Sequence, residues 1–249
     1  MRVTFYTLGC KVNQNETGAL AQLFEENGYT VVSNEEGADV YIVNSCTVTN
    51  FGDQKSRKWL RRAKRENPGA VTVLTGCYPQ AFPDEAAEIA EADVVTGSGN
   101  RHAILTDVQK VLNGEEERVV DIRPHEKGER FEELPMDKFA EHTRAFVKVE
   151  DGCNRRCAYC VIPRARGPVR SRDEASVLEE LRRLADLCAK HHVIIVSDEI
   201  HADLTLSGHK HVMMASVSDT ARDITVTMMA PTKAFNLPGV VASHTIIFN

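Results

Sequence analysis

Three cysteines in the middle of the chain stand at a spacing that suits metal chemistry. Cys153, Cys157 and Cys160 form a C-x3-C-x2-C run directly after residues that read as a strand. Thiolates are soft ligands that favour iron–sulfur clusters or zinc. A structural zinc ion would need a fourth protein ligand, and none stands close by in the sequence. The run therefore favours a four-iron cluster with one iron left free, and zinc or chance spacing is the alternative.

A second set of cysteines, Cys10, Cys46 and Cys77, follows three short apolar runs that read as strands. The carboxyl ends of parallel strands meet at one edge of a sheet, where open α/β sheets build their sites. Convergence at that edge would bring three thiols together. The alternative is three unrelated buried cysteines, because cysteine is commonly buried for packing alone.

The segments that must position these cysteines alternate between strand and helix. Expected strands cover residues 3–8, 30–32, 40–43, 71–74 and 93–95, and expected helices cover residues 15–27, 53–66 and 104–112. Such alternation predicts a parallel sheet covered on both faces. Residues 114–142 are charged and show no sustained period, which indicates a linker or a strap across a surface. A strand at 145–149, a helix at 173–190 and a strand at 193–196 are expected after them.

The overall composition sets the cellular context. The 249 residues carry a net charge of −6, so any contact with nucleic acid must come from local basic stretches. The N-terminus lacks the pattern of a signal peptide, and the longest apolar runs are too short to span a bilayer. We therefore expect a cytoplasmic protein without a membrane partner, in which seven cysteines do not form a disulfide framework.

The sequence around the first three cysteines resembles the N-terminal domain of the tRNA methylthiotransferases. The resemblance covers about residues 2–112 and is carried by LGCKVNQ (8–14), VNSCTVT (43–49) and TGC (75–77). It implies that Cys10, Cys46 and Cys77 hold an auxiliary [4Fe–4S] cluster with one iron left open. GCKVNQ most resembles the branch of the family that acts on N6-threonylcarbamoyladenosine beside the anticodon.

The second cysteine group resembles the signature of radical SAM enzymes. This resemblance implies that Cys153, Cys157 and Cys160 hold a second [4Fe–4S] cluster whose free iron chelates S-adenosylmethionine, with Tyr159 near the adenine end of that cofactor. The flanking VEDG (149–152) and VIPRARG (161–167) resemble the methylthiotransferases specifically. The family further implies a tRNA anticodon stem-loop as partner and an electron donor such as a flavodoxin or ferredoxin.

After about residue 185 the resemblance changes. HHVIIVSDEIHAD (191–203) and APTKAFNLPG (230–239) resemble the cystathionine β-lyase-like branch of the fold-type-I aminotransferases. That resemblance implies that Asp198 pairs with the pyridine nitrogen of pyridoxal phosphate, that His201 lies near the ring, and that Lys233 forms the Schiff base. Two motifs at the expected separation indicate a junction between two unrelated coding sequences, and divergent radical SAM sequence is the alternative.

Two basic stretches bear on RNA recognition. Between Cys153 and Arg172 there are six arginines and no acid, and the expected helix from Lys55 to Arg65 carries seven lysines or arginines. Such stretches serve as phosphate contacts in RNA-binding proteins, although a charge run is as often a solvated face.

The expected fold is α/β, in four parts. Residues 1–113 form a parallel-sheet methylthiotransferase domain, 114–142 a charged linker, 143–185 the truncated start of a radical SAM partial barrel, and 186–249 an incomplete aminotransferase-like α/β fragment. The expected function is a tRNA methylthiotransferase that acts at C2 of N6-threonylcarbamoyladenosine and is inactive as this truncated, fused chain. The alternatives are a pyridoxal-phosphate-dependent aminotransferase or C–S lyase, and a non-catalytic RNA-binding module.

Overall fold

A computed structural model describes residues 1–34, 36–47, 50–134, 146–205 and 208–248. The chain divides into two compact units, Met1–Arg172 and Asp173–Asn249, and each is described by itself. The expected segment 143–185 is thus divided between the two units, because the helix expected at 173–190 packs with the residues that follow it.

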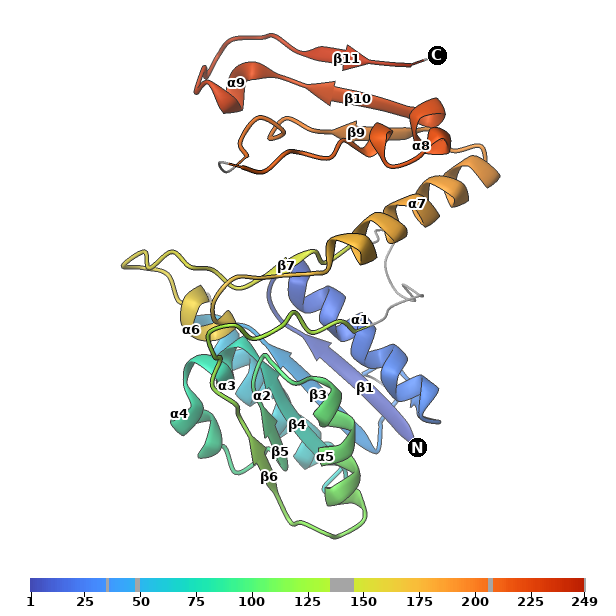
Figure 1. Ribbon diagram of the computed structural model, residues 1–249. Helices are drawn as coiled ribbons and strands as arrows, with labels where there is room; N and C mark the ends of the chain where they lie inside the picture. The colour runs from blue at the N-terminus through green and yellow to red at the C-terminus, as the bar shows by residue number, and fades with distance from the viewer. Residues whose placement is uncertain (35, 48–49, 135–145, 206–207, 249) are drawn as a thin grey trace. The chain divides into compact units, whose positions relative to one another are not determined.

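The first unit is built on a six-stranded parallel sheet with the order β2-β1-β3-β4-β5-β6 (Figure 1). Its strands are β1 (Arg2–Thr7), β2 (Thr30–Val31), β3 (Val40–Ser45), β4 (Val71–Gly76), β5 (Val94–Thr96) and β6 (Val119–Asp121). The order reverses between β1 and β3, because the chain moves outward to β2 and then returns to the other side of β1. Such a reversal opens a crevice at the carboxyl ends of the two strands.

Helices cover both faces of this sheet, as its strand sequences predict. The helices are α1 (Lys11–Glu26), α2 (Asn50–Glu66), α3 (Cys77–Ala81), α4 (Pro83–Ala87) and α5 (His102–Leu112). On one face Val40 and Ile42 pack with Phe24 of α1 and Ile104 of α5. On the other face Val43 and its neighbours pack with residues of α2, α3 and α4 (Figure 1). Because successive side chains of β3 face opposite sides and both sides are covered, the whole strand is buried, and it is apolar from Val40 to Val43.

The expected linker 114–142 is wrong in part. Residues 119–121 form β6, which pairs in parallel with β5 and completes the sheet. A strand of three residues is too short to show a period, so the sequence pattern could not reveal it. Residues 122–134 have no regular structure but are held to the sheet domain, for example by His125, which contacts Ser98. Residues 135–142 lie outside the described part.

The last segment of the first unit holds the second cysteine group. Strands β7 (Glu150–Asp151) and β8 (Arg170–Ser171) pair antiparallel and enclose helix α6 (Ile162–Arg166). The expected strand at 145–149 is not found at 146–149, and residue 145 lies outside the described part. A run of apolar residues there was mistaken for a strand, whereas Val147 and Val149 are exposed.

The second unit is small. Helix α7 (Glu174–Lys190) begins at Asp173, whose side chain accepts a hydrogen bond from the Ser176 amide, as is usual at a helix N-terminus. The other elements are β9 (Ile195–Asp198), the 3-10 turn η1 (Met214–Ser216), α8 (Asp219–Ile224), β10 (Thr225–Met229), α9 (Pro231–Ala234) and β11 (His244–Ile246). β9 and β10 are parallel, and β11 is antiparallel to β10. The strand expected at 193–196 thus begins two residues later.

None of the helices in the described ranges combines the length and the apolar character that crossing a membrane requires.

Candidate metal centre

The first three cysteines follow three adjacent strands of the parallel sheet. Cys10 comes after β1 and precedes the first turn of α1, Cys46 follows β3, and Cys77 begins α3 directly after β4. Because β1, β3 and β4 are neighbours in the sheet, all three cysteines lie at its carboxyl edge, around the reversal between β1 and β3. Cys46 and Cys77 are buried and Cys10 is exposed. The topology therefore places all three cysteines at one edge of the sheet, and their convergence on one cluster stays a prediction.

Asn13, on the first turn of α1, connects these segments. Its amide nitrogen donates to the carbonyl oxygens of Leu8 (3.0 Å) and Ser45 (2.9 Å). Its carbonyl oxygen lies 3.5 Å from Sγ of Cys10 and 4.0 Å from Sγ of Cys77. One fully buried side chain thus contacts the loop after β1, the end of β3 and two of the three thiols.

Gly9 allows the first two cysteine segments to approach. It has a φ of +111°, in the region that favours glycine, and a Cβ atom there would lie 2.7 Å from Cβ of Cys46 and 2.9 Å from its Sγ. Any side chain at this position would push the Cys46 segment away. The Gly9-Cys10 pair is therefore a requirement of packing as well as of ligand chemistry.

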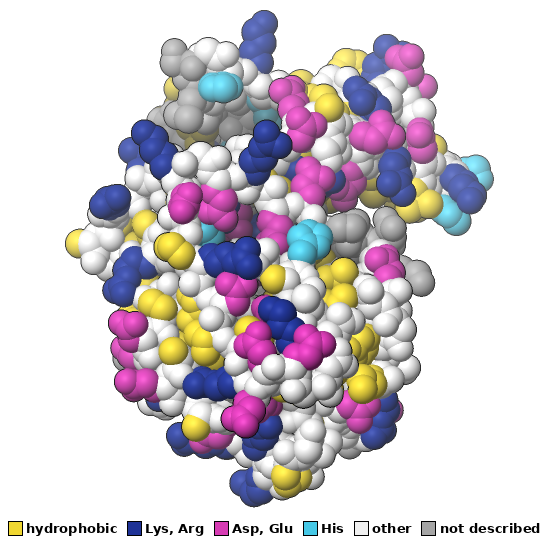
Figure 2. Space-filling model, turned by 60° about the horizontal axis from the view of Figure 1, so that its bottom comes forward, with side chains coloured by type: hydrophobic (Ala, Val, Ile, Leu, Met, Phe, Trp, Pro, Cys, Tyr) yellow, Lys and Arg dark blue, Asp and Glu magenta, His cyan; other side chains and the backbone are white. Residues whose placement is uncertain are grey.

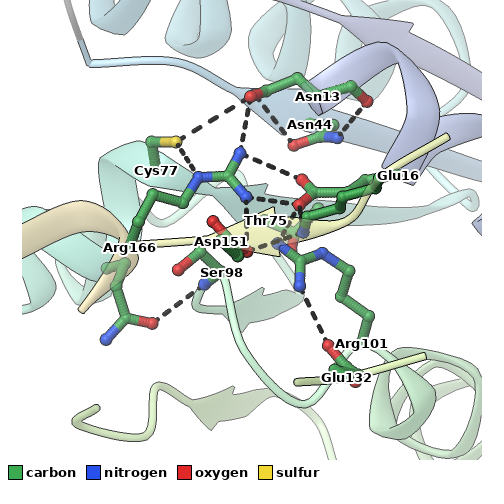
Figure 3. A network of polar contacts seen from close by, with 12 residues as sticks. Asn13, Glu16, Asn44, Thr75, Cys77, Ser98, Arg101, Glu132, Asp151 and Arg166 are labelled. Carbon is green, nitrogen blue, oxygen red and sulfur yellow. Dashed lines mark hydrogen bonds and ion pairs between the residues drawn. The ribbon is translucent and has the colours of Figure 1, made fainter. Parts of the chain in front are cut away.

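An arginine from the second cysteine segment reaches into this site (Figure 3). Arg166, the last residue of α6, donates from Nε to Sγ of Cys77 at 3.1 Å. Its Nη2 donates to Oδ1 of Asn13 at 2.7 Å and to Oε2 of Glu16 at 3.1 Å, and its Nη1 donates to Oε1 of Glu16. The Arg166 side chain is only 5% exposed and that of Glu16 only 2%. The guanidinium is thus fixed on all sides by α1 and Cys77.

Glu16 gathers three cations around one buried carboxylate. Besides Arg166, Nη2 of Arg101 lies 2.7 Å from Oε1, an ion pair without hydrogen-bond geometry, and Nζ of Lys148 donates to the same oxygen at 2.7 Å. Further carboxylates complete the balance: Asp151 pairs with Lys148 at 2.7 Å and Glu132 with Arg101 at 3.0 Å. Arg170, which pairs with Asp151 at 3.5 Å and with Glu129 at 3.1 Å, adds a fourth cation and a fourth carboxylate. The charges of the buried cluster therefore balance, as burial requires.

Titration behaviour follows from these contacts. Burial alone would raise the pKa of Glu16, but Arg101, Arg166 and Lys148 outweigh it and hold the pKa well below its ordinary value. Burial also raises the pKa of the Cys77 thiol, although Arg166 opposes that change. A buried thiol beside a fixed cation is suited to be deprotonated by a metal, because the cation then stabilises the resulting thiolate.

The second cysteine group lies on the loop between β7 and α6. The amide of Cys153 donates to the Gly167 carbonyl oxygen and that of Cys160 to the Cys157 carbonyl oxygen, each at 3.0 Å. Cys157 is exposed and the other two are half-buried. Tyr159, which the resemblance places beside adenine, is 92% exposed, so the residues that the structure describes leave its side chain largely uncovered. The assignment of Cys153, Cys157, Cys160 and Tyr159 stays a prediction.

The structure separates the arginines of the basic stretch into two kinds. Arg166 and Arg170 are buried in ion pairs, Arg164 donates to the Ala81 carbonyl oxygen at 2.7 Å, and Arg172 pairs with Glu133. The other two, Arg155 and Arg156, are exposed on the cysteine loop. Four of the six arginines therefore hold the fold together, and two are available to a ligand.

The basic helix α2 is likewise partly neutralised. Ion pairs join Arg57 to Glu85, Arg61 to Glu91, Arg62 to Glu66 and Lys64 to Asp93. Within the described ranges, Lys55, Lys58 and Arg65 have no such ion pair. Figure 2 shows lysine and arginine interspersed with aspartate and glutamate over the face in view. A high count of basic residues in a sequence therefore overstates the positive potential of this helix.

The residues of the pyridoxal-phosphate alternative share one sheet edge. Asp198 ends β9 and Lys233 lies just past the end of the parallel strand β10, so topology brings both to the same side. Asp198, His201 and Lys233 are all exposed, however. A pyridine ring needs a pocket that orients it, and three exposed side chains do not fit that requirement. We therefore derive no chemistry through this cofactor.

Asn13, Glu16, Arg101 and Arg166 were not predicted as site residues. Asn13 and Glu16 are one helical turn apart, on a helix that begins immediately after Cys10, which places them near the thiols. Arg166 stands more than 80 residues from Cys77 in sequence, so nothing local could have indicated its position.

Comparison with known proteins agrees with this arrangement. Residues 2–97 match the family described as "Uncharacterized protein family UPF0004", and residues 147–227 match the "Radical SAM superfamily". A threonylcarbamoyladenosine tRNA methylthiotransferase MtaB from Bacillus subtilis (strain 168) is 43% identical over 77% of this chain and 42% of its own length. The corresponding protein of Aquifex aeolicus (strain VF5) is 43% identical over 74% of this chain and 45% of its own. The chain thus combines a UPF0004 domain with a radical SAM domain, and it is similar to the radical SAM methylthiotransferase family.

Members of this family are enzymes, and the superfamily implies S-adenosylmethionine and an iron–sulfur cluster. The chain spans less than half the length of these two curated relatives. The radical SAM match continues to residue 227, past the junction expected near residue 186, and the position of that junction stays a prediction. Cystalysin from Treponema denticola, whose crystal structure contains pyridoxal 5′-phosphate, is 38% identical over 28% of this chain and 18% of its own. Its TM-score of 0.26 supports no conclusion.

The donor set at the sheet edge has the ligand chemistry of an iron–sulfur cluster. Its protein donors are thiols, which iron–sulfur clusters prefer. In the described ranges, no three His, Cys, Asp or Glu side chains come together closely enough to hold one metal ion. Arg166 supplies the hydrogen bond to sulfur that such sites use to stabilise their charge.

Proposed function

We propose that this chain derives from a tRNA methylthiotransferase that inserts a methylthio group at C2 of N6-threonylcarbamoyladenosine, beside the anticodon. The observation that supports the proposal is that Cys10, Cys46 and Cys77 follow three adjacent strands at one edge of the sheet, where Asn13 contacts two of them and Arg166 contacts Cys77. The names of the MtaB relatives support the substrate. Modification of tRNA would place the reaction in the cytoplasm.

Two four-iron clusters form part of this proposal. Cys10, Cys46 and Cys77 would hold the auxiliary cluster, and Cys153, Cys157 and Cys160 would hold the cluster that binds S-adenosylmethionine. A reduced cluster of the second kind supplies an electron for cleavage of the sulfonium, and an external donor such as a flavodoxin or ferredoxin would provide that electron. The chain's own contribution is to fix the thiols and to compensate charge.

We further propose that this chain has no turnover by itself. Among the described residues, Cys157 and Tyr159 on the cysteine loop are exposed, whereas radical chemistry needs a site that excludes water.

Iron analysis tests the two-cluster assignment. After anaerobic reconstitution with iron and sulfide we expect about eight irons per chain. Replacing either cysteine set by alanine should leave about four. Cys188, on α7 and outside both sets, provides the matched control, and Cys188→Ala should retain the full content. Uptake of substoichiometric zinc and no iron would contradict the proposal.

RNA binding tests the substrate assignment. The exposed Arg155 and Arg156 offer two phosphate or base contacts beside the cysteines, whereas most cations of α2 are paired. We expect an anticodon stem-loop to bind with an affinity that falls with salt, and Arg155→Ala with Arg156→Ala to weaken it. Lys55→Ala with Lys58→Ala is the matched control on α2. If only the α2 variant weakened binding, the non-catalytic RNA-binding module would be the better description.

A further inference from the structure

One arginine joins the two cysteine segments of the first unit. Arg166 follows the C-x3-C-x2-C loop by only six residues, yet its side chain contacts Cys77, which belongs to the other cysteine set. Helix α6 is also anchored independently of this contact: Nη2 of Arg164 donates to the Ala81 carbonyl oxygen at 2.7 Å, and the Ala165 carbonyl oxygen accepts from Oγ of Ser98 at 2.5 Å. The docking of α6 and the contact with sulfur can therefore be separated by mutation.

The orientation of the guanidinium is set by its partners. Glu16 binds both terminal nitrogens, and the Asn13 carbonyl oxygen takes a second bond from Nη2 (Figure 3). Asp151 adds a weaker contact at 3.5 Å. With its two terminal nitrogens fixed in this way, the planar group directs Nε at Sγ of Cys77. Lysine could supply the charge here but not the planar fork.

We propose that Arg166 is a positioning residue for the auxiliary cluster, which holds the Cys77 sulfur and tunes the cluster's reduction potential through an Nε–H···S hydrogen bond. This inference rests on the proposed ligand set. Hydrogen bonds to cluster sulfurs stabilise the more negative, reduced state, and second-shell partners of metal ligands affect affinity strongly. The residue thereby makes the auxiliary site dependent on the segment that carries the other cluster.

Glu16 has the opposite electrostatic effect. It anchors Arg166 but also offsets its positive charge. Glu16→Gln removes a negative charge behind the guanidinium and keeps the side-chain volume, so it should raise the reduction potential. Arg166→Met removes the cation and the hydrogen bond to sulfur, so it should lower the potential. If Arg166 and Glu16 had only a structural role, both substitutions would cause loss of the cluster and would not shift the reduction potential in opposite directions.

The test uses the full chain with Cys153, Cys157 and Cys160 replaced by alanine, so that only the auxiliary site can take up iron. In that background we compare the unmodified site, Arg166→Met, Arg166→Lys, Glu16→Gln and the docking control Arg164→Met. Iron release to a chelator and the midpoint potential are measured after anaerobic reconstitution. We expect iron release to be about 10-fold faster in Arg166→Met and its potential to be more negative, with little change in Arg164→Met.

Other results for the release rate and the midpoint potential would contradict either the role of Arg166 or the cluster assignment. Equal release rates and potentials for Arg166→Met and the unmodified site would overturn the inference and leave the cluster assignment intact. If iron release became faster to the same extent in Arg166→Met and Arg164→Met, the docking of α6 alone would account for retention of the cluster. No iron in the unmodified site would refute the cluster assignment and the inference together. If Arg166→Met does not fold, Arg166→Lys decides: behaviour identical to arginine would overturn the hydrogen-bond role.

Discussion

Glu16→Gln should destabilise the first unit substantially even without any metal. The carboxylate is almost fully buried and pairs with three cations. Removing one partner of a buried ion pair costs about 3–5 kcal/mol. Each cation here keeps a second acceptor: Asp151 for Lys148 and Arg166, and Glu132 for Arg101. We therefore expect the low end of that range, about 3 kcal/mol. For a unit of this size that loss corresponds to a decrease in Tm of about 6–12 °C.

The assay is urea and thermal unfolding followed by tryptophan fluorescence. The only tryptophan of the chain, Trp59, packs against Tyr6 in the first unit and reports that unit alone. Glu25→Gln, at an exposed position on the same helix, is the matched control. Because the folded pKa of Glu16 is depressed, its contribution should be present above about pH 4.3, the ordinary glutamate pKa, and be lost at lower pH. A Glu16→Gln variant within about 0.5 kcal/mol of wild type would refute the reasoning.

Three further changes test other parts of the first unit by the same fluorescence assay. Burial lowers the pKa of His125 in the folded chain, so on acidification the unfolded chain binds a proton first. The free energy of unfolding should therefore fall as the pH drops through about 6.5. His125→Gln should reduce this dependence of stability on pH, and an unchanged dependence would contradict the role given to His125. Ile104→Ala, on the buried face of α5, should lower the free energy of unfolding by about 2–5 kcal/mol. A change near zero would mean that α5 does not pack on the sheet. Gly76→Ala should destabilise more than Gly28→Ala, since both have positive φ but only at Gly76 would a Cβ meet backbone and side-chain atoms within 3 Å; equal costs would disprove the clash.

The sequence predicted the sheet domain well, because its signals are local. Buried parallel strands are continuous apolar runs, and the helices between them show their own period, so β1, β3, β4 and the three long helices were expected close to their observed positions. Boundaries coincide or differ by up to four residues, the largest difference being at α1, which begins at Lys11 and not at Asn15. The strands that were missed or misplaced are short: β6 has three residues and β7 two. Their pairing depends on neighbours that are distant in sequence.

The basic stretches show a second limit of sequence reasoning. A count of charges cannot tell whether an arginine faces solvent or a carboxylate. In α2 the carboxylates that neutralise Arg57 and Arg61 come from residues 85 and 91. Only the fold brings these partners together, so only the fold can show how much positive charge remains for RNA.

The candidate site divides in the same way. The sequence by itself predicted the cysteines as ligands, because ligand chemistry depends on residue type and spacing, and it determined their common sheet edge, because parallel strands all end on the same side. Tertiary structure alone decided what surrounds them. Arg166 reaches Cys77 only because α6 docks against the end of the sheet, and Glu16 becomes a buried acceptor only because Arg101, Lys148 and Arg166 arrive from three separate segments. Electrostatic partners are selected by distance in space, which the order of residues along the chain does not encode.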